Sequence, residues 1–122
     1  DLFADETRCD AMAISVGNTH LQLDKNTNVD IQDIVAVQNL TDTALVLHGG
    51  SGIDLLLRAK IARETNVCKC NIGTELRKTF GDSLRFSLKN NPEIYDKIQL
   101  LDSTANDIKK ATKIVIENLS KV

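Results

Sequence analysis

The chain contains two histidines, His20 and His48, and each lies at the end of a short apolar run, next to small or polar residues. Imidazoles that project from neighbouring strands can meet at one metal ion and leave an open position for a substrate. We therefore predict that His20 and His48 are metal ligands, with a third protein ligand upstream of Asp1. The alternative is a pair of hydrogen-bonded histidines that cap the two strands.

A glycine-rich segment, His48-Gly49-Gly50-Ser51-Gly52, follows the second apolar run. Small residues after a strand let backbone N–H groups converge on an anion, and the next helix adds its positive N-terminus. The hydroxyl of Ser51 adds a further polar group. We predict that Gly49, Gly50 and Ser51 bind a phosphate; the alternative is a tight turn that needs the permissive dihedral angles of glycine.

The third apolar run ends in Asn71-Ile72-Gly73-Thr74. The amide of Asn71 can hold a substrate hydroxyl or carbonyl beside the metal, although asparagine also caps ordinary turns. Cys68 and Cys70 alternate with Asn71 along the strand, so they are predicted to point away from the site as reduced core residues. A Cys–His metal site is the alternative for these two thiols.

The elements that must position these residues alternate along the chain. Strands are predicted at residues 11–16, 44–47 and 67–72, and helices at residues 29–40, 53–64, 75–88 and 105–119. The order β-α-β-α-β-α-α predicts a parallel sheet, whose strands all end at the same edge. We therefore expect the polar residues that follow the three strands to share one mouth.

Three parallel strands leave two edges unpaired, and a complete (β/α)8 barrel has about 250 residues. The 122 residues are therefore predicted to be the C-terminal part of a (β/α)8 TIM barrel. In this interpretation residues 1–122 form a single-domain fragment with the last three strands and their helices. The start at Asp1, before a segment typical of a helix end, agrees with a fragment.

Composition excludes several classes of function. The formal charge of −2, from 15 basic and 17 acidic residues, provides no basic field for nucleic acid. No apolar run has the length of about 18 residues that a membrane span needs. Three cysteines are neither the even number nor the density of a secreted disulfide scaffold, so a cytoplasmic protein is expected.

Three blocks of sequence carry a resemblance to a known family. They are Asp10-Ala11-Met12-Ala13-Ile14-Ser15-Val16-Gly17-Asn18-Thr19-His20, Leu45-Val46-Leu47-His48-Gly49-Gly50-Ser51-Gly52-Ile53 and Lys69-Cys70-Asn71-Ile72-Gly73-Thr74-Glu75-Leu76. In this order and spacing they resemble class II, zinc-dependent ketose-bisphosphate aldolases, above all the fructose and tagatose branch. The segment Asn91-Pro92-Glu93-Ile94-Tyr95-Asp96 is also similar to that family.

The resemblance implies a TIM barrel that cleaves fructose or tagatose 1,6-bisphosphate to dihydroxyacetone phosphate and an aldehyde phosphate. Zinc polarises the ketone in that family, and an Asp outside this chain transfers the proton. Asn71 matches a position near the reacting carbons. A monovalent cation near the phosphate and a homo-oligomer, dimer or tetramer, are also implied for the full-length chain. By position, the resemblance assigns zinc to His20 and His48 and substrate binding to Leu21, Gly49, Gly50, Ser51, Asn71, Ile72, Gly73 and Thr74.

The chain departs from the family pattern at three places, of which Asn66, in place of a common glycine, is expected to have no consequence. Leu21 stands where the family has a glycine whose backbone approaches the phosphate, and a side chain there could crowd the anion. Asp54-Leu55-Leu56-Leu57 replaces a proline and an acidic helix start. Two other interpretations stay open: a metal-free sugar-phosphate isomerase or synthase barrel, and a non-catalytic aldolase-like subunit. The 122 residues alone are expected to be inactive, because a ligand and the proton-transferring Asp are missing.

Overall fold

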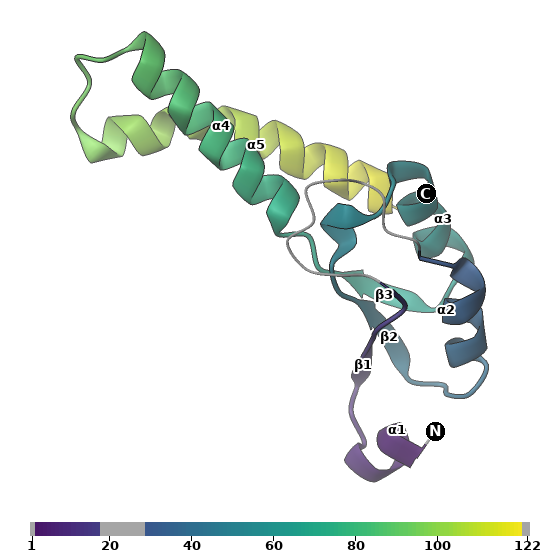
Figure 1. Ribbon diagram of the computed structural model, residues 1–122. Coiled ribbons are helices and arrows are strands. Elements are labelled where there is room, and N and C mark those ends of the chain that lie inside the picture. Colours follow the sequence, from purple (N-terminus) through teal and green to yellow (C-terminus); the bar gives the residue numbers. More distant parts are fainter. Residues whose placement is uncertain (1, 18–28, 121–122) are drawn as a thin grey trace.

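The computed structural model describes residues 2–17 and 29–120, which form a mixed α/β structure around one parallel sheet (Figure 1). The sheet has the strand order β1-β2-β3, and both strand pairs are parallel. This confirms the predicted fold class. In chain order the elements are α1 (Leu2–Thr7), β1 (Ala11–Ile14), α2 (Ile31–Gln38), β2 (Ala44–Leu47), η1 (Gly50–Gly52), α3 (Leu55–Glu64), β3 (Val67–Cys70), α4 (Thr74–Asn90) and α5 (Lys97–Leu119).

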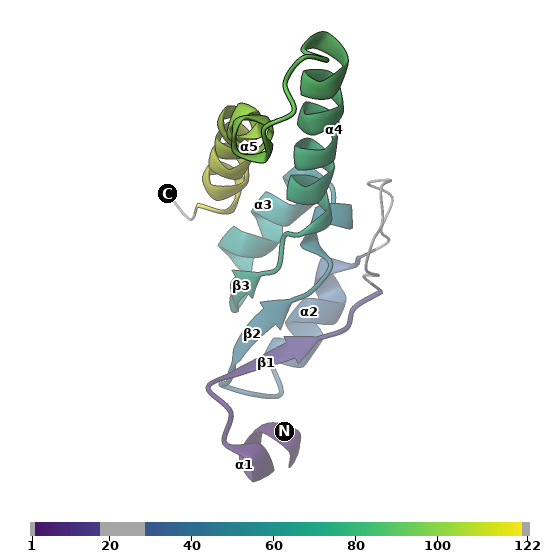
Figure 2. The ribbon, with the colours of Figure 1, turned by 90° about the vertical axis from the view of Figure 1, so that its left-hand side faces the viewer.

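The core lies between the sheet and the helices α2 and α3, which cover the same face of it (Figure 2). Leu45 and Leu47 of the central strand β2 are fully buried and pack with Ile34 of α2 and Ile61 of α3. Successive strand residues point to opposite faces, so Val46 and His48 share the face away from these helices. His48 therefore lies just after β2, on the sheet face opposite to α2 and α3.

Helices α4 and α5 form an antiparallel hairpin that projects away from the sheet (Figures 1 and 2). A partly buried polar contact joins them, because the hydroxyl of Ser83 donates to the carboxylate of Asp107 at 2.7 Å. Helix α5 starts at Lys97, well before the predicted start at residue 105. The reason is the cap: Asp96 accepts a hydrogen bond from the backbone N–H of Gln99 at 2.9 Å.

The start of α3 depends on Asp54. Its carboxylate accepts hydrogen bonds from the backbone N–H groups of Leu56 at 2.8 Å and Leu57 at 3.3 Å. These N–H groups have no partner within the helix, so the side chain satisfies them. Asp54, which replaces the proline of the family pattern, therefore starts α3 as an N-cap.

Of the two cysteines of β3 that were predicted to lie in the core, only Cys70 packs there. Cys70 is half-buried and packs against the core cluster, but Cys68 is exposed, so the assignment of both to the core is wrong for Cys68. The cause is an irregularity in the register of β3: Val67 pairs with Leu45 and Lys69 pairs with Val46, so Cys68 is an extra residue without a partner in β2. Its side chain lines a shallow surface groove beside Leu119 at the end of α5. Both thiols are reduced.

Within residues 2–17 and 29–120, no helix is both long and apolar enough to cross a membrane.

The Asp54 cap can be tested by substitution. We expect Asp54→Ala to lower the free energy of unfolding of the full-length protein by about 1 kcal/mol, because two N–H groups lose their acceptor. Asp54→Asn keeps an acceptor and should lose much less. Urea unfolding monitored by circular dichroism measures both variants, and an equal loss in the two would contradict the capping role.

Candidate functional site

The loops that follow β2 and β3 are held together by their backbones. The N–H of Asn71 donates to the carbonyl of Leu47 at 2.9 Å, and the N–H of Gly50 donates to the carbonyl of Asn71 at 3.1 Å. The parallel pairing of the strands thus continues past their ends. The glycine-rich segment and residues 71–75, which include the start of α4, therefore form one rim. This confirms that the residues after these two strands share one edge.

His48 and Asn71 lie side by side at this rim, and both are half-buried. The side-chain amide nitrogen of Asn71 is 3.3 Å from each of the two ring nitrogens of His48. The amide can donate to whichever ring nitrogen carries no proton. A group held by the imidazole would therefore be within reach of the amide as well.

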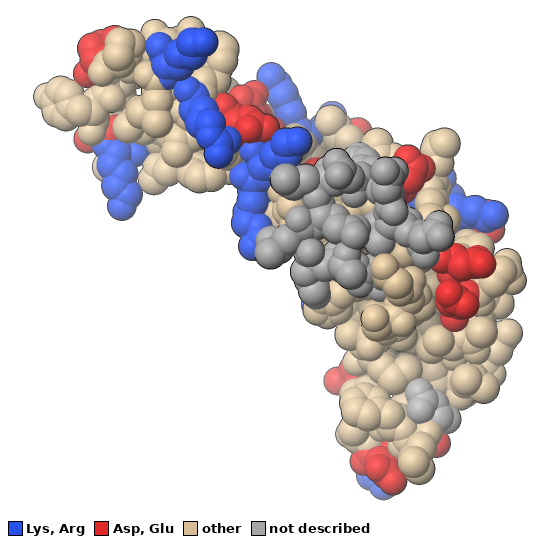
Figure 3. Space-filling model, viewed as in Figure 1, with Lys and Arg blue, Asp and Glu red and all other residues tan. Residues whose placement is uncertain are grey.

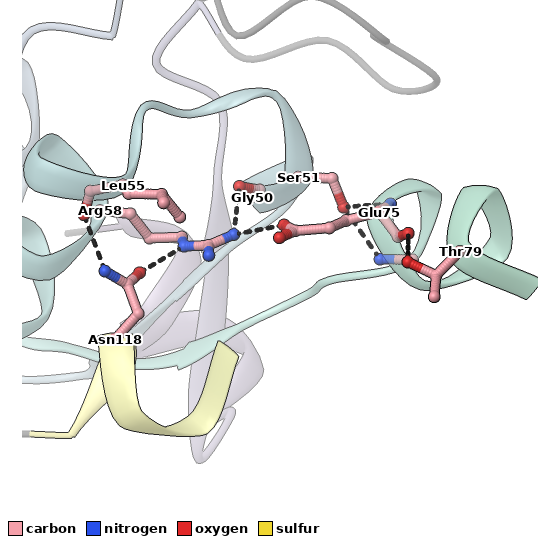
Figure 4. Close-up of polar contacts among 8 residues, drawn as sticks. Gly50, Ser51, Leu55, Arg58, Glu75, Thr79 and Asn118 are labelled. Atoms are coloured by element: carbon pink, nitrogen blue, oxygen red, sulfur yellow. Dashed lines mark hydrogen bonds and ion pairs between the residues drawn. The ribbon is translucent and has the colours of Figure 1, made fainter. Parts of the chain in front are cut away.

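The hydroxyl oxygen of Ser51 lies at the N-terminus of α4. It accepts hydrogen bonds from the backbone N–H groups of Gly73 and Glu75, each at 3.2 Å (Figure 4). The first N–H groups of a helix have no partner within the helix and attract oxygen atoms, above all those of anions. The glycine-rich segment thus reaches the helix N-terminus that a phosphate would use.

Two glycines of the segment are required by their surroundings. Gly49 has φ 65°, in the left-handed region that disfavours residues with a side chain. A Cβ on Gly50 would collide with Sγ of Cys70 and would lie 2.8 Å from Cδ1 of Ile72. The predicted permissive turn is therefore present, and it packs directly on the segment that follows β3.

Basic side chains lie next to this rim. Nη2 of Arg77 is 3.0 Å from the place where a Cβ on Gly73 would lie, so its guanidinium covers that glycine. Figure 3 shows Lys and Arg side chains along the hairpin arm as far as its junction with the sheet. The sequence analysis missed Arg77, although the spacing of four residues from Gly73 on a helix was a usable signal.

A second charged residue that the sequence analysis missed is Arg58 of α3. Its Nη1 donates to the carbonyl of Gly50 at 3.3 Å and to the carboxylate of Glu75 at 2.9 Å. Both partners belong to the rim, although Arg58 itself is buried beneath it.

His20 and Leu21 lie outside the described residues, so the shared metal and the effect of Leu21 stay predictions. The described part of the chain contains no group of three His, Cys, Asp or Glu side chains that could hold a metal ion. Of the two predicted histidine ligands, His48 lies in the described part of the chain. The alternative, a metal site of Cys and His side chains, is not present among the described residues either.

The family model for class II fructose-bisphosphate aldolase matches residues 1–122. The chain belongs to this family. Enzymes of class II aldolase families are lyases and are generally zinc-dependent.

A solved structure agrees with the fold of this aldolase family member. The YdjI aldolase from Escherichia coli K12 superimposes with a TM-score of 0.75 at 24% sequence identity, over 98% of this chain. The match covers 42% of the YdjI chain, so the class II aldolase chain described here spans less than half the length of that protein.

Two glycines provide a matched pair of substitutions. We expect Gly50→Ala to lower the free energy of unfolding by about 1–3 kcal/mol, since the new methyl group must displace Cys70 and Ile72. Gly81→Ala should raise it by about 0.5–1 kcal/mol, because Gly81 lies inside α4, where alanine is the better helix former. Urea unfolding of the full-length variants tests both signs, and a neutral Gly50→Ala would show that the loop is not packed on β3.

The two cysteines of β3 should differ in reactivity. Burial raises the pKa of the Cys70 thiol, and the charge of Arg58 offsets part of that rise. Since the thiolate is the reactive form, we expect iodoacetamide at pH 8 to modify exposed Cys68 faster than Cys70. Peptide mass spectrometry over time measures the two rates, and equal rates would contradict the burial of Cys70 under the loop.

Proposed function

We propose that the full-length protein carrying this chain is a metal-dependent aldolase that cleaves fructose or tagatose 1,6-bisphosphate to dihydroxyacetone phosphate and an aldehyde phosphate. The observation that carries the proposal is the meeting of His48, Asn71 and Ser51 on one rim in a class II aldolase chain. This chain contributes the last three strands of the barrel, and the remaining strands supply the proton-transferring Asp and another ligand.

The phosphate of the substrate is bound between the glycine-rich segment and the start of α4. The N–H groups of Gly73 and Glu75 hold the oxygen atom of Ser51 at this place, and the Ser51 hydroxyl donates its proton in a hydrogen bond to the phosphate. The N–H of Gly50 donates to the carbonyl of Asn71, so Gly50 contributes close approach to the segment that follows β3 and no donor to the anion. Gly49 provides the left-handed turn, and Ile72 and Thr74 complete the rim. A monovalent cation near this phosphate belongs to the same proposal.

His48 and His20 hold the zinc ion in this proposal, which fits the imidazole that His48 presents at the rim. A bound zinc ion supplies Lewis-acid polarisation of the substrate ketone. Asn71 orients the substrate, because its amide lies 3.3 Å from the ring nitrogens of His48 and can bind a hydroxyl or carbonyl placed there. Because Leu21 replaces the glycine of the family pattern, this proposal includes a weaker affinity for the phosphate. The enzyme is cytoplasmic and works as a homo-oligomer.

The proposal predicts aldol cleavage by the full-length protein that is lost in chelator and restored by zinc. His48→Ala should lower kcat by about 100-fold or more and reduce bound zinc, measured by elemental analysis. Ser51→Ala should raise KM for the bisphosphate about tenfold, because the phosphate loses a hydrogen bond. The isolated 122 residues should show no turnover.

Three results would contradict this assignment. Activity that persists in chelator would favour a metal-free sugar-phosphate isomerase or synthase barrel. A zinc-loaded protein without turnover on either bisphosphate would favour a non-catalytic subunit. Turnover by the isolated 122 residues would show that the missing Asp and ligand are not needed.

A further inference from the structure

Arg58 is buried in the middle of a polar network (Figure 4). Arg58 is 1% exposed, and its side chain is the largest of the fully buried side chains among the described residues. Besides Gly50 and Glu75, it contacts Asn118 of α5, since Nε donates to the side-chain oxygen of Asn118 at 2.7 Å. Asn118 in turn donates to the carbonyl of Leu55 at 2.9 Å. One guanidinium therefore joins the glycine-rich segment, α3, α4 and α5.

Stability alone gives a poor account of this arginine. Removing a guanidinium from water is costly, and replacing a buried ion pair by apolar side chains is often neutral or stabilising. Nη2 of Arg58 is moreover buried without a hydrogen-bond partner among the described residues, which adds to that cost. An apolar side chain of similar volume cannot supply hydrogen-bond donors. The rigid guanidinium provides N–H groups of fixed orientation, which hold particular oxygen atoms in place.

The oxygen atoms that Arg58 holds belong to the rim. The carbonyl of Gly50 precedes Ser51, and the carboxylate of Glu75 belongs to the residue whose N–H donates to Ser51. The Glu75 carboxylate carries a full negative charge and the Gly50 carbonyl oxygen a partial one, and both lie beside the place where the anion binds. The guanidinium offsets that charge and fixes the distance between the two loops.

We propose that Arg58 is a positioning residue of the phosphate subsite, which keeps the glycine-rich segment against the start of α4 and neutralises Glu75 there. Arg58 does not touch the substrate. It acts through the Gly50 carbonyl and the Glu75 carboxylate, so that the subsite is arranged before the phosphate arrives. This inference rests on the proposed function, since it presumes that the rim binds a phosphorylated substrate.

The test compares phosphorylated and unphosphorylated substrates in the full-length protein loaded with zinc. Arg58→Met preserves much of the buried volume and removes the directed N–H groups. We expect it to raise the Kd for inorganic phosphate and the KM for dihydroxyacetone phosphate in aldol condensation about tenfold, with kcat changed less than about threefold. The KM for unphosphorylated dihydroxyacetone should stay the same. Arg58→Lys keeps the charge and should recover part of the loss.

Arg63→Met is the matched control, because Arg63 lies on the same helix and is exposed. It should leave all these constants unchanged. If Arg58→Met does not fold because Glu75 is left without its partner, the double variant Arg58→Met/Glu75→Gln removes both charges and should show the same loss of phosphate affinity.

The outcomes separate the two proposals. A folded Arg58→Met or double variant with an unchanged Kd for inorganic phosphate overturns the positioning role. An equal rise in KM for phosphorylated and unphosphorylated substrates also overturns it, since it indicates general damage to the site. If the unaltered full-length protein binds no inorganic phosphate and converts no dihydroxyacetone phosphate, the proposed function itself fails, and that result precedes any variant.

Discussion

The backbone hydrogen bonds that extend the β2–β3 pairing past the strand ends join the two loops on which the site depends. Asn71, after β3, donates its backbone N–H to the carbonyl of Leu47 in β2 and accepts a hydrogen bond from the N–H of Gly50 in the loop after β2. Because parallel strands end at a common edge, this pairing brings together side chains that lie more than twenty residues apart in the sequence. Any change that separates the two strands would therefore separate the two loops of the site.

Around this frame, small residues and one buried charge make the rim compact. Gly50 has no side chain to keep the loop away from Cys70 and Ile72, and Ser51 reaches the N-terminus of α4 as a consequence. Arg58 then ties the same loop to α4 and to the end of α5. The projecting hairpin is thus connected to the rim through a buried network, even though most of it lies away from the sheet.

Most of the fold could be predicted from local patterns. Buried parallel strands give short apolar runs, and an Asp before an apolar-periodic segment marks a helix start, as at Asp30 and Asp54. The rim residues were predictable because loops after parallel strands share an edge. Other features depend on details of pairing and packing. Cys68 is exposed because the register of β3 shifts at this residue, and Arg58 is buried although arginine on a helix usually faces water. Sequence spacing does not report such tertiary contacts.

The central claim is that the rim formed by His48, Asn71 and Ser51 is one substrate site. A crystal structure of the full-length protein with zinc and dihydroxyacetone phosphate tests it most directly. We expect a metal ion on His48, phosphate oxygens within hydrogen-bond distance of Ser51 and the N–H of Gly73, and the amide of Asn71 in contact with the bound dihydroxyacetone phosphate. A metal ion away from His48, or a phosphate bound elsewhere in the barrel, would contradict it.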